Sequence, residues 1–385
     1  MTPELVHLRA LGWDHPRCLR PMEACAIAWS LRRPDIAISW EARSLADFGD
    51  QPLEEVAGRY DLLMIDYPFC GAAEVAGVLR PLDELLTANE LIALSVDAIG
   101  PSHESYAFDG HQWALAIDAA CQVSAVSPSL LGARPAPRTW EEALALARDL
   151  APRVALPLAP AHSISSFLTL CANAGSPPAA DPDRLVQRDV GEWAIDTLSE
   201  FYSRGPAAAT QWEPPDVLGR LTTTDELSYV PLTYGFITYA SPSDALFPCR
   251  FVDIPSSGYG PVGATLGGAG LAISATSQHP HEAAAFAAWS SSSDVQRTIV
   301  ARSGGQPGSR SAWTDPALDH DSRGFYSDTI TTIENAWVRP RDAWWPPFQL
   351  EGGRLLTRII EDGGDAGRAL VQLEALYLNG LRGHG

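Results

Sequence analysis

The sequence predicts an α/β fold made of two lobes. Short apolar runs typical of strands alternate along the chain with amphipathic runs typical of helices. Because strands separated by helices usually pair in parallel, this alternation indicates largely parallel sheets. At 385 residues the chain is long enough to enclose two hydrophobic cores, and it exceeds the usual size of a single domain.

The N-terminal part of the chain supplies three predicted strands and a helix. Residues 5–13 alternate apolar and polar side chains with the period of a strand, and strands are also predicted over 36–44 and the buried run 60–66. A helix is predicted to begin after Pro21 and to end before Pro34, since proline disfavours a continuing helix.

The remaining elements continue the alternation. Thr139 can cap a helix over 139–150, because Glu142 lies three residues further on, as a capping box requires. Further strands are predicted over 113–118, 153–159, 226–236 and 250–255, and in an apolar run that ends at Ser274. Further helices are predicted over 81–92, 164–175, 191–205, an Ala-rich segment after Pro280, and 365–383.

Composition narrows the class of partner. The formal net charge of −20 argues against nucleic acid or an anionic membrane, because its field repels phosphates, although it leaves room for a small anionic ligand held by local arginines. The six cysteines contain no CxxC pair, so reduced thiols are expected. No clustered Cys/His or HExxH motif is present, and we expect neither a metal nor a cofactor.

The N-terminal residues indicate in which cellular compartment the protein is expected. The run MTPELVHLRALGW lacks a cationic segment followed by a long apolar stretch, so no secretory signal is predicted. No run approaches the roughly 20 apolar residues of a membrane helix, and an integral membrane protein is not expected. The sequence as it stands therefore favours the cytoplasm, and an extracytoplasmic location is expected if a leader was removed.

An ordered series of motifs resembles one known family. Residues 258–274 read GYGPVGATLGGAGLAIS. They are followed by a His-Pro step, an Ala-rich helix with Phe286 and Trp289, then Gln296 and a Gly-Gly-Gln-Pro turn. Three more segments belong to the series, in this order along the chain: YDLLMIDYPFCGAAEVAGVLRPLDELL, GHQWALAIDAACQVSAVSPSLL and RPRDAWWPPFQ. This series resembles family 1 extracellular solute-binding proteins, the ligand receptors of sugar-type ABC importers.

The resemblance implies a specific architecture. It implies a periplasmic-binding-protein-like fold of type II, in which the chain crosses about three times between two α/β lobes and the ligand sits in the cleft. The crossings are expected near Asp118–Gln122, Arg250–Ser257 and Ser303–Ser311. Lobe one is then 1–118 plus 254–303, and lobe two is 119–253 plus 304–385.

The first candidate site residues follow the first predicted strand. Ligands of open α/β sheets bind at the carboxyl ends of strands, where Trp13 offers a flat face and Asp14 and Arg17 offer polar anchors. Asp14 and His15 are also an acid/base candidate, since an imidazole beside a carboxylate titrates near neutral pH. In the structural alternative, Asp14 caps the next turn and His15 has no role in the site.

Other candidates follow later strands and turns. Asp66 and Tyr67 come after the third strand, where they can contact ligand or form a structural corner. Asp118 lies beside the first expected crossing, and either accepts ligand hydroxyls or hydrogen-bonds backbone at the hinge. Weaker candidates are Tyr234, Gly268 in a Gly-Gly-Ala-Gly loop, and Gln306; tight turning between strands is the alternative for the glycines.

Two functions are consistent with these residues. In the first, the protein binds a small carbohydrate or polyhydroxylated metabolite by closure of its lobes, with an ABC permease as partner if it is exported. In the second, it is a cytoplasmic enzyme that reuses the fold, in which Asp14, His15, Tyr67 and Asp118 perform acid/base catalysis. Binding is favoured because no nucleophile or metal motif stands out.

Overall fold

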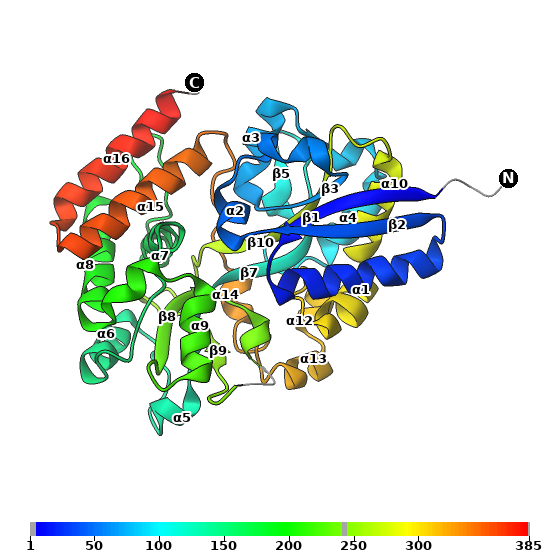
Figure 1. Cartoon of the computed structure of the whole chain (residues 1–385). Helices are drawn as coiled ribbons and strands as arrows, with labels where there is room; N and C mark the ends of the chain where they lie inside the picture. The colour runs from blue at the N-terminus through cyan, green and yellow to red at the C-terminus, as the bar shows by residue number, and fades with distance from the viewer. Residues whose placement is uncertain (1–4, 241–244, 384–385) are drawn as a thin grey trace. The chain divides into compact units, whose positions relative to one another are not determined.

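The computed structural model describes residues 5–240 and 245–383, and the chain forms two compact units (Figure 1). Unit 1 comprises Met1–Ala119, Gly267–Leu318 and Arg341–Ala343. Unit 2 comprises Ala120–Leu266, Asp319–Pro340 and Trp344–Gly385. The described residues include no helix long and apolar enough to cross a membrane. The α/β prediction is confirmed, but the expectation of largely parallel sheets is wrong, because most strand pairings among the described residues are antiparallel.

The sheet of unit 1 brings the ends of three parallel strands to one edge. β1 (Val6–Trp13) pairs in parallel with β2 (Ile36–Arg43) along its whole length and with β3 (Leu62–Ile65). β10 (Leu266–Ser274) runs antiparallel to β3, with Gly270 opposite Ile65. Parallel strands end at the same edge of a sheet, so the residues after these three strands gather there.

Unit 1 has its core between this sheet and its helices. Helix α1 (Pro16–Arg32) packs along β2, as Figure 1 shows in blue, and buries Met22 and Cys25 against Leu8 and Phe286. The other regular elements are α2 (Leu45–Asp50), α3 (Cys70–Ala76), α4 (Ala88–Val96), α10 (Pro280–Ser290), α11 (Ser293–Val295), α12 (Arg310–Trp313), β4 (Leu79–Arg80), β5 (Ala107–Phe108) and β6 (His111–Gln112). Helix α13 (Pro316–Asp321) begins in this unit.

Unit 2 is built on β7 (Leu115–Val126), which enters from unit 1 and pairs antiparallel with β8 (Tyr229–Tyr234) and β9 (Arg250–Val252). Helix α7 (Pro160–Asn173) is buried along most of its length, because α8 (Arg188–Arg204) and α15 (Trp345–Asp362) both pack on it. The other helices are α5 (Pro128–Leu131), α6 (Trp140–Asp149), α9 (Pro214–Thr223), α14 (Ile330–Glu334) and α16 (Ala366–Arg382).

Several predicted elements differ from those observed. Helix α1 begins at Pro16 and not after Pro21, because His15 caps it and Pro16 fits its first turn. The expected helix 81–92 is divided, since Thr87 starts α4 with a capping box. The expected strand 153–159 is absent apart from a bridge between Val154 and Tyr229. The Thr139 capping box is confirmed.

The segment before β10 stays with unit 2, although we expected it in lobe one from residue 254. The Asp253 carboxylate accepts two hydrogen bonds from Thr332, one from the backbone N at 3.0 Å and one from the side-chain hydroxyl at 2.6 Å. Further along, Gly263 N donates to Asn335 O and Leu266 N to Trp337 O, each at 2.9 Å. These bonds hold 253–266 in unit 2 until β10 begins.

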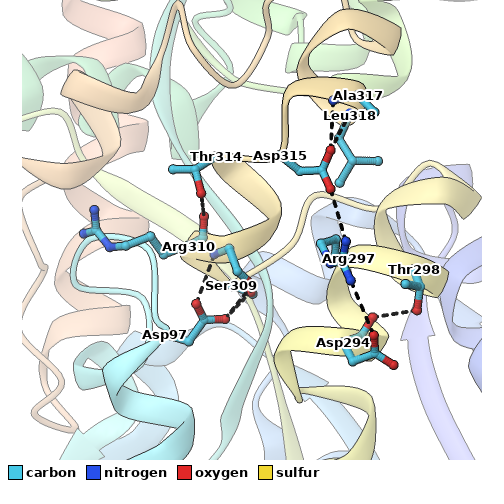
Figure 2. Close-up of polar contacts among 11 residues, drawn as sticks. Asp97, Asp294, Arg297, Thr298, Ser309, Arg310, Thr314, Asp315, Ala317 and Leu318 are labelled. Atoms are coloured by element: carbon cyan, nitrogen blue, oxygen red, sulfur yellow. Dashed lines mark hydrogen bonds and ion pairs between the residues drawn. The ribbon is translucent and has the colours of Figure 1, made fainter.

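The segment after residue 303 likewise stays in unit 1, where Asp97 anchors it (Figure 2). Asp97 lies at the end of α4, and its carboxylate accepts from the Ser309 hydroxyl and, at 3.0 Å each, from Ser311 N and Oγ. Arg310 N donates to Asp97 O at 2.5 Å. The unit divisions fall after 119, 266 and 318, whereas we expected lobe boundaries after 118, 253 and 303, and Arg341–Ala343 also belongs to unit 1.

We expect this anchor to make the stability of the protein pH-dependent. Burial raises the pKa of Asp97, but hydrogen bonds from serines outweigh burial and leave this pKa below its usual value. A carboxyl whose pKa is depressed in the folded state stabilises the fold at neutral pH, and this contribution is lost as pH falls through the folded pKa. In urea unfolding, Asp97→Ala should therefore lower the free energy of unfolding at pH 7 more than at pH 3. An equal loss at both pH values would contradict this.

Candidate functional site

Polar residues from three strand ends gather at the carboxyl edge of the unit 1 sheet. Trp13 ends β1 opposite Arg43, which ends β2, and Asp66 follows β3. Asp14 is exposed, and its backbone N–H donates to Arg43 O at 2.8 Å. Asp66 is half-buried, so two carboxylates remain near the surface of this edge. The sequence correctly placed these residues at strand ends but missed Arg43.

His15 caps helix α1 and is a poor acid/base candidate. Its Nδ1 accepts a hydrogen bond from Arg17 N at 3.1 Å. Burial, with the charges of Arg17 and Arg20, lowers the pKa of His15 to about 4. Burial first, and then these two cationic neighbours, oppose the titration near neutral pH that we expected of His15. The cap is also His15, not Asp14 as the structural alternative supposed.

The lowered pKa of His15 gives a direct prediction. Between the usual value of 6.5 and about 4, the unfolded chain binds a proton that the folded chain does not, so stability rises with pH across this window. In NMR titrations the His15 ring signals should titrate near pH 4. A midpoint above pH 6 for His15 would contradict the structure.

Arg17 and Asp118 form a buried ion pair in unit 1. The Arg17 Nε donates to Asp118 Oδ2 at 2.8 Å, and Nη2 contacts Oδ1. Only 4% of the Arg17 side chain and 5% of the Asp118 side chain is exposed. Burial raises the pKa of Asp118, and the guanidinium opposes this rise. The carboxylate that was considered a hydroxyl acceptor therefore positions Arg17 at the start of α1.

Trp13 and Tyr67 are core residues in this structure. The Trp13 ring is 3% exposed and packs on Phe48, with ring centroids 4.9 Å apart. Tyr67 is fully buried edge-on against Tyr106 at 6.1 Å. Asp66 Oδ1 accepts from Tyr67 N at 3.0 Å, which is the structural corner considered from the sequence. A ligand contact by Trp13 or Tyr67 stays a prediction.

Gly268 and Gln306 support β7 in this structure. Gly268 lies within strand β10 and not in a loop, and a Cβ there would be 2.3 Å from Asp118 O. Gln306 Nε2 donates to Ala119 O, and Ala119 N donates to Gln306 O, both at 2.8 Å. Both residues therefore hold the backbone around Ala119, where the chain passes into unit 2.

Unit 2 contributes a separate polar cluster at the start of α7. His162 Nε2 contacts Glu213 Oε2, and the His162 ring lies 6.0 Å from that of Tyr234 at the end of β8. The Tyr234 hydroxyl donates to Ser165 Oγ at 3.4 Å. Burial raises the pKa of Glu213, but His162 outweighs it and the net pKa lies below its usual value. The sequence suggested Tyr234 alone.

The missed residues had weak sequence signals. His162 follows Pro160, a common first residue of helices, but the helix was predicted only from 164. Arg43 lies near the end of the strand predicted over 36–44. Nothing in the sequence shows that its guanidinium is buried. The described residues contain no group of three His, Cys, Asp or Glu side chains that could hold a metal ion.

The fold is that of an α/β protein with two compact units. The chain belongs to the bacterial extracellular solute-binding protein family, whose model matches residues 47–322. No curated protein matches the sequence.

Solved structures share the fold across nearly the whole chain. An ABC transporter solute-binding protein from Thermotoga lettingae, bound with α-D-tagatose, has a TM-score of 0.83 at 15% identity, covering 98% of this chain and 100% of its own. Maltose-bound MalE3 of T. maritima has a TM-score of 0.82 at 18% identity, covering 98% and 99%. An Agrobacterium radiobacter solute-binding protein in complex with ribitol has a TM-score of 0.82 at 19% identity. This match covers 97% of this chain and 98% of the other.

Proposed function

We propose that this protein reversibly binds a carbohydrate or related polyhydroxylated compound. Family membership supports this proposal most strongly, because a single family model covers residues 47–322. Solved structures of the same fold are described with tagatose, maltose and ribitol, all polyhydroxylated compounds. The expected closure of two lobes on the ligand is part of this proposal.

The carboxyl edge of the unit 1 sheet supplies suitable acceptors. Asp14 and Asp66 are carboxylates that remain partly accessible at the ends of β1 and β3. Carboxylates accept strong hydrogen bonds from hydroxyl groups, and two of them at neighbouring strand ends can orient a compound with several hydroxyls. The His162, Glu213 and Tyr234 cluster of unit 2 offers a second set of polar groups.

Three of the four residues considered for catalysis are poorly suited to it. His15 is neutral at neutral pH, Tyr67 is fully buried, and the carboxylate of Asp118 is paired with Arg17. Burial raises the pKa of the Cys70 thiol, which disfavours its reactive thiolate. We therefore propose binding without turnover in preference to the enzyme considered from the sequence.

Partner and compartment belong to the same proposal. A receptor for an ABC permease acts outside the cytoplasmic membrane, whereas an intracellular sensor or enzyme acts in the cytoplasm. The two locations considered from the sequence can therefore be distinguished by fractionating cells that produce the protein. Recovery with the extracytoplasmic fraction would support the permease partnership, and recovery in the cytoplasm would contradict it.

A thermal-shift screen tests the binding proposal. Monosaccharides, oligosaccharides and polyols should include a compound that raises the melting temperature, because a ligand that binds only the folded state stabilises it. Asp14→Asn and Asp66→Asn should each weaken its binding by about tenfold, the loss of one charge-assisted hydrogen bond. Asp294→Asn, an exposed substitution in unit 1, is the matched control and should bind as wild type. Unchanged affinity in both test variants would exclude this edge as the site.

A further inference from the structure

Two buried side chains at the carboxyl edge of unit 1 carry hydrogen-bond donors that lack an acceptor. Arg43 is 8% exposed, and its Nη2 donates to Met64 O at 3.3 Å, whereas its Nε and Nη1 have no partner. Trp13, its register partner on β1, has a buried indole Nε1 without a partner. Each unsatisfied buried donor is costly, so native proteins generally supply such a donor with an acceptor.

The two side chains lie around one aromatic ring. Register partners of a parallel pair project to the same face of the sheet. Phe48 of α2 contacts both of them, with its ring centroid 4.9 Å from that of Trp13 and 5.5 Å from Arg43 Cζ. The unpartnered donors therefore belong to one cluster of Trp13, Arg43 and Phe48, which we call the Arg43 cluster.

Among the described residues, none forms an ion pair with Arg43. The acid whose charge acts on Arg43 is Asp47, and the Asp47 Oδ2 already accepts a hydrogen bond from Ser44 Oγ at 2.7 Å. Burial lowers the pKa of Arg43 to about 10, although the charge of Asp47 opposes this. A buried, unpaired guanidinium is unfavourable by itself, whereas guanidinium groups bind carboxylates and phosphates strongly.

We propose that the Arg43 cluster is an anion subsite, and that the ligand is a polyhydroxylated compound that carries an acidic group. Arg43 and the Trp13 indole donate to the oxygens of a carboxylate or phosphate, and Asp14 and Asp66 at the same edge accept from hydroxyls. Such a ligand needs a local cation, because the chain as a whole carries a net charge of −20. This inference rests on the proposed function and narrows its substrate class to sugar acids and sugar phosphates.

Titration calorimetry with matched pairs of compounds tests the subsite. The pairs are galacturonate with galactose, gluconate with sorbitol, and glucose 6-phosphate with glucose. We expect at least one acid to bind about tenfold or more tightly than its neutral counterpart, as expected for a charge-assisted hydrogen bond. The carboxylate and phosphate pairs distinguish the two sources of the anion.

Variants complete the test. Arg43→Met should abolish the preference for the acid, whereas Arg9→Met, which removes an exposed arginine paired with Glu41 on the same sheet, should retain it. Unliganded Arg43→Met should melt no lower than wild type, because it removes an unpaired buried charge. A melting temperature several degrees lower would show that Arg43 stabilises the fold, and would overturn the proposal.

The binding outcomes separate this inference from the proposed function. Neutral compounds that bind as tightly as the acids, or an acid preference that survives in Arg43→Met, overturn the anion subsite and leave the proposed function standing. If no member of any pair binds and the wider screen of polyhydroxylated compounds is also negative, the proposed function fails and the subsite fails with it.

Discussion

Replacing Arg17 with methionine is expected to lower the free energy of unfolding by about 3–5 kcal/mol, as for other buried ion pairs that lose one member. The substitution leaves the Asp118 carboxylate buried without its guanidinium, and both side chains are at least 95% buried in unit 1. Chemical denaturation at pH 7 measures the loss. The loss should shrink at acidic pH, because burial raises the pKa of Asp118 and protonation removes the unpaired charge.

The matched control for this prediction is Arg9→Met. Arg9 pairs with Glu41 at 2.9 Å, but both side chains are about half exposed, and exposed ion pairs contribute little to stability. A double variant, Arg17→Met with Asp118→Leu, should recover much of the loss, because it removes both charges together. A single variant as stable as wild type, or a double variant no better than Arg17→Met, would contradict the ion-pair interpretation.

Gly268→Ala is expected to destabilise unit 1 by at least about 3 kcal/mol, or to prevent folding. Gly268 has φ +120°, which side chains rarely adopt, and its Cβ would lie 2.3 Å from Asp118 O and 3.0 Å from Ala119 Cα. Both obstacles are backbone atoms of β7 and cannot rotate away. Thermal and urea unfolding of the purified variant measure the effect.

Gly77→Ala separates crowding from backbone strain. Gly77 also has a positive φ of +63°, but nothing lies within 4 Å of its Cβ position. We therefore expect a loss of only about 1–2 kcal/mol there, the cost of the left-handed conformation alone. Equal losses at the two glycines would show that the close approach of β10 to β7 does not matter.

Much of the fold was predictable because it depends on local patterns. The alternation of residues 5–13 predicted β1, and Thr139 with Glu142 predicted the start of α6. The start of α1 was not predictable from Pro21 alone, because His15 supplies the cap before it. The unit divisions depend on tertiary hydrogen bonds such as those of Asp97 and Asp253, which leave no periodic signal in the sequence.

The sequence predicted that the candidate site residues follow strands, but not how the folded chain surrounds them. Strand ends identified Trp13, Asp14 and Asp66 correctly as members of one edge, since parallel strands end together. The pairing of Arg17 with Asp118, 101 residues apart, and the cationic surroundings of His15 arise only on folding. Arg43 shows the same difficulty, because a charged residue at a strand end is usually solvated and this one is buried.

Binding without turnover is tested most directly by one experiment on the purified full chain. Titration calorimetry with the compound that most raises the melting temperature is followed by mass spectrometry of that compound in the same cell. We predict saturable heat with a stoichiometry near one and recovery of the compound unchanged. Continuous heat with a new product would show an enzyme, and no saturable heat with any polyhydroxylated compound would contradict the proposed function.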